Sequence, residues 1–169
     1  MAATVRAAAG AVVVAAAFAA WAAWSWVTAA GDPAVTAARA RDEALRAGTE
    51  HVAVLSSLDH RRVDEGIARW LAVSTGPLRE KLAATSEETK RALRADRTVA
   101  TATVLDAGVG ELGPRGDSAT LLASVETSLA REGQPPASTR NRFLVRMQRT
   151  DAGWRVRELE RIPVAGGTP

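Results

Sequence analysis

The first thirty residues contain a long stretch without charge. From Ala7 to Ala30 no Asp, Glu, Lys or Arg occurs, although these residues make up 24% of the chain. As a helix this stretch would extend about 36 Å, and the hydrocarbon core of a bilayer is roughly 30 Å thick. The sequence therefore predicts a transmembrane signal anchor over residues 7–30, after a short N-terminal tail of residues 1–6.

Tryptophans lie near one end of this predicted anchor and a cation lies at the other. Trp21, Trp24 and Trp26 suit the headgroup layer, and Arg6 precedes the span. We therefore expect a single-pass protein of the cell membrane with an extracytoplasmic C-terminal domain. A cleaved secretory signal stays open, because Val27-Thr28-Ala29 is a small-x-small site. An alanine-rich helix of a soluble core fits less well, since no polar face interrupts the stretch.

The composition narrows the chemistry that the chain can perform. It has no cysteine, which excludes disulfides, thiolate nucleophiles and cysteine metal sites. Its two histidines are His51 and His60, and tyrosine is absent, so few groups titrate near neutral pH. His51 lies on the apolar face of a predicted helix, where we expect a hydrogen-bonded core residue. Neither metal-ligand spacing nor a cofactor motif is present, so we predict a non-enzyme without metal or cofactor.

The chain beyond the anchor reads as one domain over residues 31–164, followed by a mobile tail over residues 165–169. Asp32-Pro33 is a helix-start pattern, since the carboxylate accepts backbone amides and proline lacks one. Apolar residues then recur at helical spacing, and Thr75-Gly76-Pro77 is expected to end the second helix. The predicted helices cover roughly residues 33–59, 64–73 and 78–93.

After Arg94 the apolar residues recur at every second position, which is typical of strands. The turn Thr150-Asp151-Ala152-Gly153 predicts a hairpin between the last two of them. Residues 108–117 and 131–139 are rich in Gly and Pro and are expected to be long loops. The predicted strands are 98–105, 119–129, 142–148 and 154–157. Helices followed by antiparallel strands predict an α+β fold.

The last third of the chain is basic, with eight arginines and four acidic residues between Arg131 and Arg161. Along one strand, side chains two residues apart point to the same face of the sheet, and side chains of a neighbouring strand can lie beside them on that face. Such a face would hold Arg140, Arg142, Arg146, Arg155, Arg157 and Arg161. A solvated outer face is the simplest interpretation, and docking of an acidic protein or anionic lipid headgroups is the functional one. Nucleic acid is not expected, because exposed aromatics are not interleaved.

Several short segments, taken in order, resemble a known family. They are Val54-Leu55-Ser56-Ser57-Leu58-Asp59, Ser74-Thr75-Gly76-Pro77-Leu78, Ala119-Thr120-Leu121-Leu122-Ala123-Ser124-Val125, and the stretch from Arg146-Met147-Gln148-Arg149 to Gly153-Trp154-Arg155-Val156. With the N-terminal anchor, this succession resembles the actinobacterial Mce-associated membrane proteins. The resemblance implies a nuclear transport factor 2-like cone, with about three helices on a curved four-stranded antiparallel sheet. It also implies a link to Mce lipid-import systems of the cell envelope.

Three functions are compatible with this resemblance. The first is a non-catalytic accessory or scaffold protein that binds components of an Mce-type transporter. The second is a domain that holds an apolar ligand, a lipid or steroid, in the cone. The third is an isomerase-like or dehydratase-like enzyme of the same superfold, which rests on fold analogy alone. Candidate walls of the ligand pocket are Trp70, Phe143, Val145, Met147 and Trp154, which equally form an ordinary core.

Overall fold

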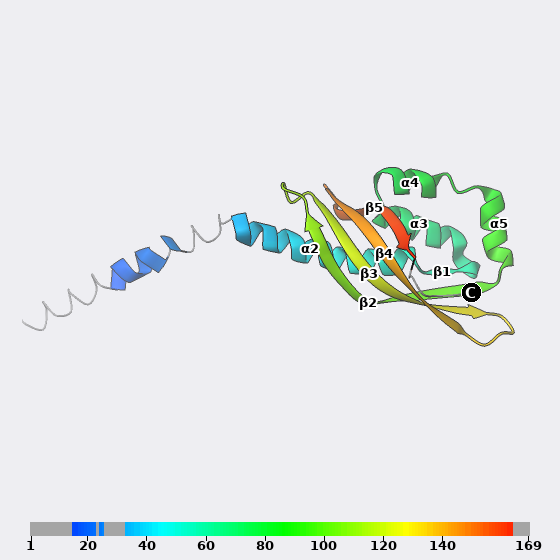
Figure 1. Ribbon diagram of the computed structural model, residues 1–169. Coiled ribbons are helices and arrows are strands. Elements are labelled where there is room, and N and C mark those ends of the chain that lie inside the picture. The colour runs from blue at the N-terminus through cyan, green and yellow to red at the C-terminus, as the bar shows by residue number, and fades with distance from the viewer. Residues whose placement is uncertain (1–14, 23, 26–32, 164–169) are drawn as a thin grey trace, which may run out of the picture. The chain divides into compact units, whose positions relative to one another are not determined.

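The computed structural model describes residues 15–22, 24–25 and 33–163 (Figure 1). The chain divides after Arg39 into two compact units. In the first unit, residues 15–22 and 24–25 are helical. Among the described residues, no helix combines the length and apolarity that a membrane crossing requires. Most of the predicted anchor (residues 7–14, 23 and 26–30), the N-terminal tail and the tail predicted for residues 165–169 lie outside the described residues.

Helices fill the described chain from Pro33 to Ala95. They are α2 (Pro33–Leu55), the short 3-10 helix η1 (His60–Arg62), α3 (Val63–Val73), α4 (Gly76–Ala83) and α5 (Glu87–Ala95). The first bound, Pro33, is the predicted one, but α2 ends at Leu55 and not near Asp59. The reason is tertiary, because Leu58–Asp59 pairs with a later strand as β1. The second helix, predicted to start at Asp64, starts one residue earlier at Val63, and Asp64 lies in the first turn of α3.

The single helix predicted for residues 78–93 is two helices. Ser86 interrupts it, since its Oγ accepts a hydrogen bond from the Thr89 backbone N–H at 3.1 Å and caps α5. α3 ends at Val73, shortly before Thr75-Gly76-Pro77 as predicted, and the same triplet begins α4. Just before α4, the Thr75 N–H donates to the Val156 carbonyl at 2.9 Å and joins this segment to the last strand.

The sheet is antiparallel, in the order β1-β2-β3-β4-β5. Its strands are β1 (Leu58–Asp59), β2 (Thr98–Leu112), β3 (Ser118–Arg131), β4 (Ala137–Thr150) and β5 (Gly153–Ile162). The α+β class and the final hairpin are confirmed, and β1 is an additional strand. The loop predicted for residues 108–117 is wrong at its start, because β2 continues to Leu112. Bulges at Val104/Asp106 and Val109/Glu111 let β2 carry glycines and still pair with β3.

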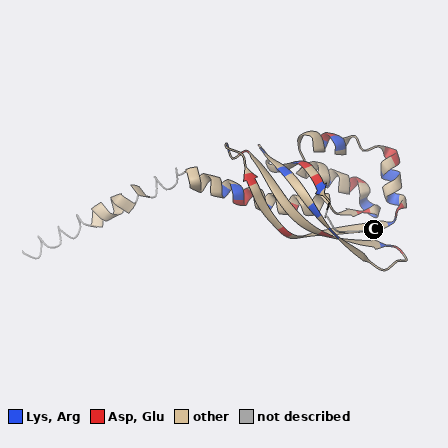
Figure 2. Cartoon of the chain, viewed as in Figure 1, with Lys and Arg blue, Asp and Glu red and all other residues tan. Residues whose placement is uncertain are grey.

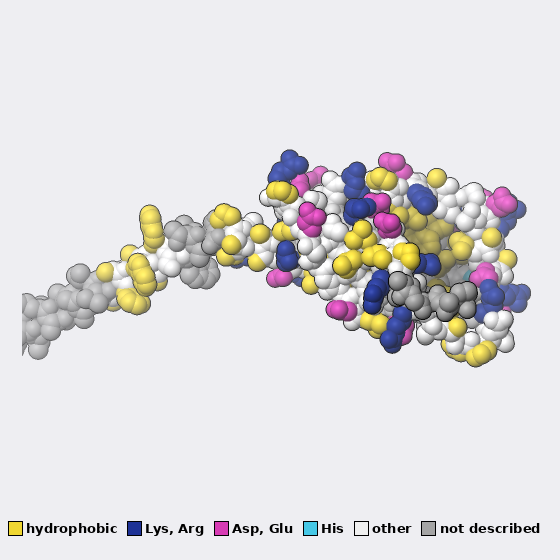
Figure 3. Space-filling model, in the orientation of Figure 1, with side chains coloured by type: hydrophobic (Ala, Val, Ile, Leu, Met, Phe, Trp, Pro, Cys, Tyr) yellow, Lys and Arg dark blue, Asp and Glu magenta, His cyan; other side chains and the backbone are white. Residues whose placement is uncertain are grey.

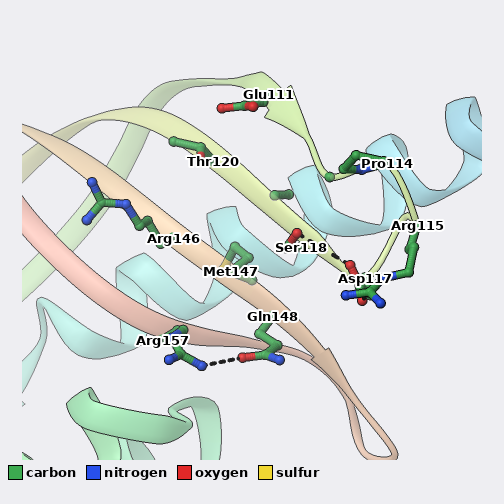
Figure 4. Close-up of a pocket in the computed structure, with 12 residues that line it drawn as sticks. Glu111, Pro114, Arg115, Asp117, Ser118, Thr120, Arg146, Met147, Gln148 and Arg157 are labelled. Atoms are coloured by element: carbon green, nitrogen blue, oxygen red, sulfur yellow. Dashed lines mark hydrogen bonds and ion pairs between the residues drawn. The ribbon is translucent and has the colours of Figure 1, made fainter.

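The hydrophobic core lies between α2 and one face of the sheet. Alternate residues of β3 and β4, among them Leu121, Val125 and Val145, are at most 1% exposed. They meet small residues of α2, where Gly48 lies directly against the Leu121 side chain. We call the opposite face of the sheet the outer face. In Figure 4 the helix lies behind the sheet, and Glu111, Thr120 and Arg146 project from the outer face.

A serine just after the end of α2 ties that helix to β2. The Ser57 Oγ accepts from the Ala102 backbone N–H at 3.0 Å and donates to the Ala53 carbonyl at 2.8 Å. Along the same edge, Arg41 Nη1 donates to the Val109 carbonyl at 3.4 Å. The helix therefore uses backbone groups of β2 that no strand pairs with.

Candidate interaction surface

Three arginines of the predicted face lie on the outer side of β4. Arg140, Arg142 and Arg146 alternate with core residues of this strand and are exposed. Arg155 of β5 pairs with Gln148, which lies on the same face. Figure 2 shows basic and acidic positions interspersed along the strands.

A register shift in β5 changes where the last two predicted arginines lie. The shift falls opposite Arg146/Met147, and Arg157 occupies it, donating from Nη1 to Gln148 Oε1 at 2.7 Å. Beyond it, Arg161 pairs with Phe143, whose side chain packs against the core. Arg161 therefore lies on the opposite face from Arg142, and the expectation of one shared face fails for this residue. An alternating pattern cannot reveal an extra residue that shifts its phase.

The outer face is mixed in charge. Arg140 Nε lies 3.1 Å from Glu126 Oε1, and Arg146 forms an ion pair with Glu158. Arg142, in contrast, has no ion pair within residues 33–163. Such exposed pairs contribute little stability, typically about 0 to 1 kcal/mol each, so their main effect is on what the face can attract.

A cleft of about 440 Å³ opens on the outer face beside the β2–β3 turn (Figure 4). Its walls come from the turn and from β2, β3, β4 and β5. They include Glu111, Thr120, Arg146, Gln148 and Arg157. In the turn, Arg115 Nε lies 3.3 Å from Asp117 Oδ2. Sequence reasoning missed this cleft, because its walls meet only through strand pairing.

The candidate wall residues of a ligand pocket are mainly core residues. Val145, Met147 and Trp154 are at most 4% exposed, and Phe143 packs against them. Trp70 lies apart from this group on α3. Its Nε1 donates to the carbonyls of Val54 at 2.9 Å and Ser57 at 3.1 Å, which holds α3 against the end of α2.

The acidic residues on and beside β2 and β3, which are Asp106, Asp117 and Glu126, do not converge on one site. Asp106 pairs with Ser124 on the outer face, Asp117 lies in the β2–β3 turn, and Glu126 is bound to Arg140. Over the part of the chain that the structure describes, no three His, Asp or Glu side chains are grouped as metal ligands.

The two histidines lie in different helices: His51 is in α2, and His60 is the first residue of η1. His60 Nδ1 is 3.7 Å from Asp59 Oδ1. A hydrogen bond from the Arg61 N–H, at 2.9 Å, is the main cause that lowers the pKa of Asp59. Burial and, secondarily, the charge of Arg155 lower the pKa of His51. The expected hydrogen bond of His51 is not found at Nδ1, which is buried without a partner among the described residues.

Acidification is expected to destabilise the domain through His51. Because the folded state lowers the pKa of His51, the unfolded chain binds more protons below its ordinary value of about 6.5. The stability contributed by neutral His51 is thus present above that value and is lost as pH falls toward the folded pKa. The free energy of unfolding should therefore fall between about pH 7.5 and pH 5.5, and His51→Leu should make this fall smaller. Urea titrations at several pH values measure the free energy of unfolding of both proteins. The same decrease with falling pH in the wild type and in His51→Leu would contradict the prediction.

Comparison with known proteins finds likeness in fold alone. No protein-family profile and no curated protein sequence matches the chain. A periplasmic fragment of TraM matches with a TM-score of 0.57 and 17% identity, over 71% of this chain and 95% of that one. An IcmL-like type IV secretion system protein from Legionella pneumophila matches with a TM-score of 0.58 and 10% identity, over 82% of this chain and 97% of that one. Agrobacterium tumefaciens VirB8 matches with a TM-score of 0.55 and 11% identity, over 72% of this chain and 92% of that one.

These matches define the class of fold. Each spans nearly the whole neighbouring domain, and helices on one face of a curled antiparallel sheet are common to them. The domain therefore has the nuclear transport factor 2-like cone fold. A fold of this kind hosts several activities, so function has to be argued from the surface and the chain itself.

Proposed function

We propose that this chain is a membrane-anchored, non-catalytic accessory or scaffold protein of a cell-envelope transport system, and that it acts through protein contacts. The observation that carries the proposal is the shared fold with the TraM fragment and the IcmL-like type IV secretion protein, which extends over 95% and 97% of those domains. The uncharged stretch at residues 7–30 supplies a membrane attachment, and the lipid bilayer is accordingly one partner.

The packing of the cone supports protein contacts over storage of an apolar ligand. Val145 is 0% and Met147 2% exposed, and both lie in one continuous cluster with Trp154. The outer face, by contrast, carries exposed charge and an open cleft. We propose that the domain makes its protein contacts through such exposed surface and not through an interior pocket.

The specific system that we propose is an Mce-type lipid importer of an actinobacterial envelope. This proposal rests on the short segments between Val54 and Val156, whose order along the chain resembles that of the Mce-associated proteins. The domain would then lie on the outer side of the membrane, beside the transporter components that it supports.

Crosslinking in intact cells followed by affinity capture tests the partner. The tagged full chain is compared with a control that keeps residues 1–32 but has an unrelated soluble domain in place of the rest of the chain. We expect permease or Mce-type subunits to be enriched only with the full chain. Equal recovery with both chains, or enrichment of no envelope protein, would overturn the proposed role.

Thiol labelling tests the side of the membrane independently. Because the chain has no cysteine, Asp151→Cys in the exposed β4–β5 turn creates a single thiol. A membrane-impermeant maleimide should label it in intact cells to the same extent as in lysed cells. Labelling that requires lysis would contradict an extracytoplasmic domain.

A further inference from the structure

Apolar side chains form a strip across the outer face of the sheet. Leu122 is 52% and Leu105 46% exposed, and Leu144 lies beside Leu122 on the neighbouring strand. Figure 3 shows hydrophobic side chains gathered on the sheet with basic and acidic ones around them. Exposed leucines in the middle of a strand are unusual unless another surface covers them.

The strand register places Leu122 and Leu144 in a row between two charged rows, and Leu105 lies in the bulge of β2 next to Asp106. Three neighbouring rows cross β2, β3 and β4 on the outer face. They are Asp106–Ser124–Arg142, Gly108–Leu122–Leu144 and Glu111–Thr120–Arg146. The β2 end of the outer rows is acidic and the β4 end is basic. In the middle row the β2 end is empty, since a Cβ at Gly108 would meet no atom within 4 Å.

We propose that this face binds a second copy of the same chain, with a two-fold axis parallel to β3 that passes over Leu122. Such an axis exchanges the β2 side with the β4 side and keeps each residue in its own row. Asp106 of one copy then faces Arg142 of the other, and Glu111 faces Arg146. Leu122 meets Leu122, and Leu144 enters the open space over Gly108.

Charge distinguishes a second copy from other occupants. An acidic partner would be attracted by Arg142 but repelled by Asp106 and Glu111 on the β2 side. A second copy satisfies both borders at once. Within residues 33–163, Asp106 and Arg142 have no ion pair of their own, so both are available for contact. Contact over three rows is small, and we expect a weak, micromolar dimer that confinement to one membrane favours.

Charge exchange between two residues tests the geometry. The full chain in detergent is analysed by sedimentation over a concentration series. Asp106→Arg and Arg142→Glu should each raise the dimer dissociation constant at least about tenfold, because like charges then face each other. The double variant should restore dimerisation, and a mixture of the two single variants should form heterodimers. Asp151→Arg, a charge reversal in the exposed β4–β5 turn, should change nothing.

A thiol on the axis gives a second readout. Leu122→Cys creates the only cysteine of the chain, and we expect a short bis-maleimide to join two copies through it, because face-to-face sheets lie about 10 Å apart. The same thiol at Thr89→Cys, on the exposed side of α5, should join far fewer. A monomer at every concentration, or a dimer insensitive to both charge reversals, would overturn the proposal. Loss of capture of an acidic protein in Arg142→Glu that the double variant does not restore would assign the face to that partner instead. None of these outcomes depends on the proposed transporter role.

Discussion

Replacing Gly48 with valine is expected to lower the free energy of unfolding by about 3 kcal/mol, at the upper end of typical overpacking costs. Gly48 lies in the buried face of α2, and a Cβ built there would come within 2.4 Å of Leu121 Cδ2. Leu121 is 1% exposed and surrounded by core side chains, so it cannot rotate away without displacing them. Chemical denaturation followed by circular dichroism measures the change.

A compensating substitution tests whether the contact itself causes the loss. Leu121→Ala alone should cost about 3 kcal/mol, because it leaves a cavity in the core. Combined with Gly48→Val, the added methyl groups occupy part of that cavity. The double variant should therefore be more stable than the sum of the two single losses predicts. Strict additivity would show that Gly48 and Leu121 do not oppose each other in the folded state.

Trp154 is expected to contribute through its size and not through its indole N–H. It is 4% exposed, and its Nε1 is buried without a hydrogen-bond partner among the described residues. Trp154→Ala should cost about 4 kcal/mol, as large aromatic truncations do. Trp154→Phe keeps most of the ring and removes an unpaired donor, so it should cost less than about 1.5 kcal/mol.

Trp154→Phe keeps the contact of the ring with Arg149, so its comparison with Trp154→Ala isolates the effect of side-chain size. Arg149 lies over the Trp154 ring at 5.9 Å and bonds to Glu43 at 2.8 Å, and phenylalanine keeps a ring face for this contact. Thermal and urea unfolding of both variants give the two losses. If Trp154→Phe is as damaging as Trp154→Ala, the indole N–H has a partner in the folded protein.

Local patterns were enough to predict most of the fold. The change of apolar period after Arg94 separated helices from strands, and the Asp151-Gly153 turn placed the last hairpin. The break at Ser86 and the short strand at Leu58 were missed for different reasons. A serine inside a helical pattern is ambiguous until its hydroxyl caps a new helix. Leu58 pairs with Ala100, and no local pattern encodes such a long-range pairing.

The candidate surface was predictable only in part. Alternation placed Arg140, Arg142 and Arg146 on one face, because β4 is regular where they occur. It failed at Arg161, where a bulge shifts the phase. The rows of the outer face depend on the register of β2 against β3, which includes two further bulges. Neither bulge position follows from composition or spacing.

Both borders of the sheet are occupied at a few positions by other parts of the chain. On one side, Ser57 and Arg41 bond to backbone groups of β2, and on the other Thr75 bonds to Val156 of β5. Unpaired strand edges are the usual route by which sheet proteins grow into fibrils, and here that route is obstructed at each end. Copies of this domain at high local concentration therefore associate more readily through their faces than by polymerising through their edges.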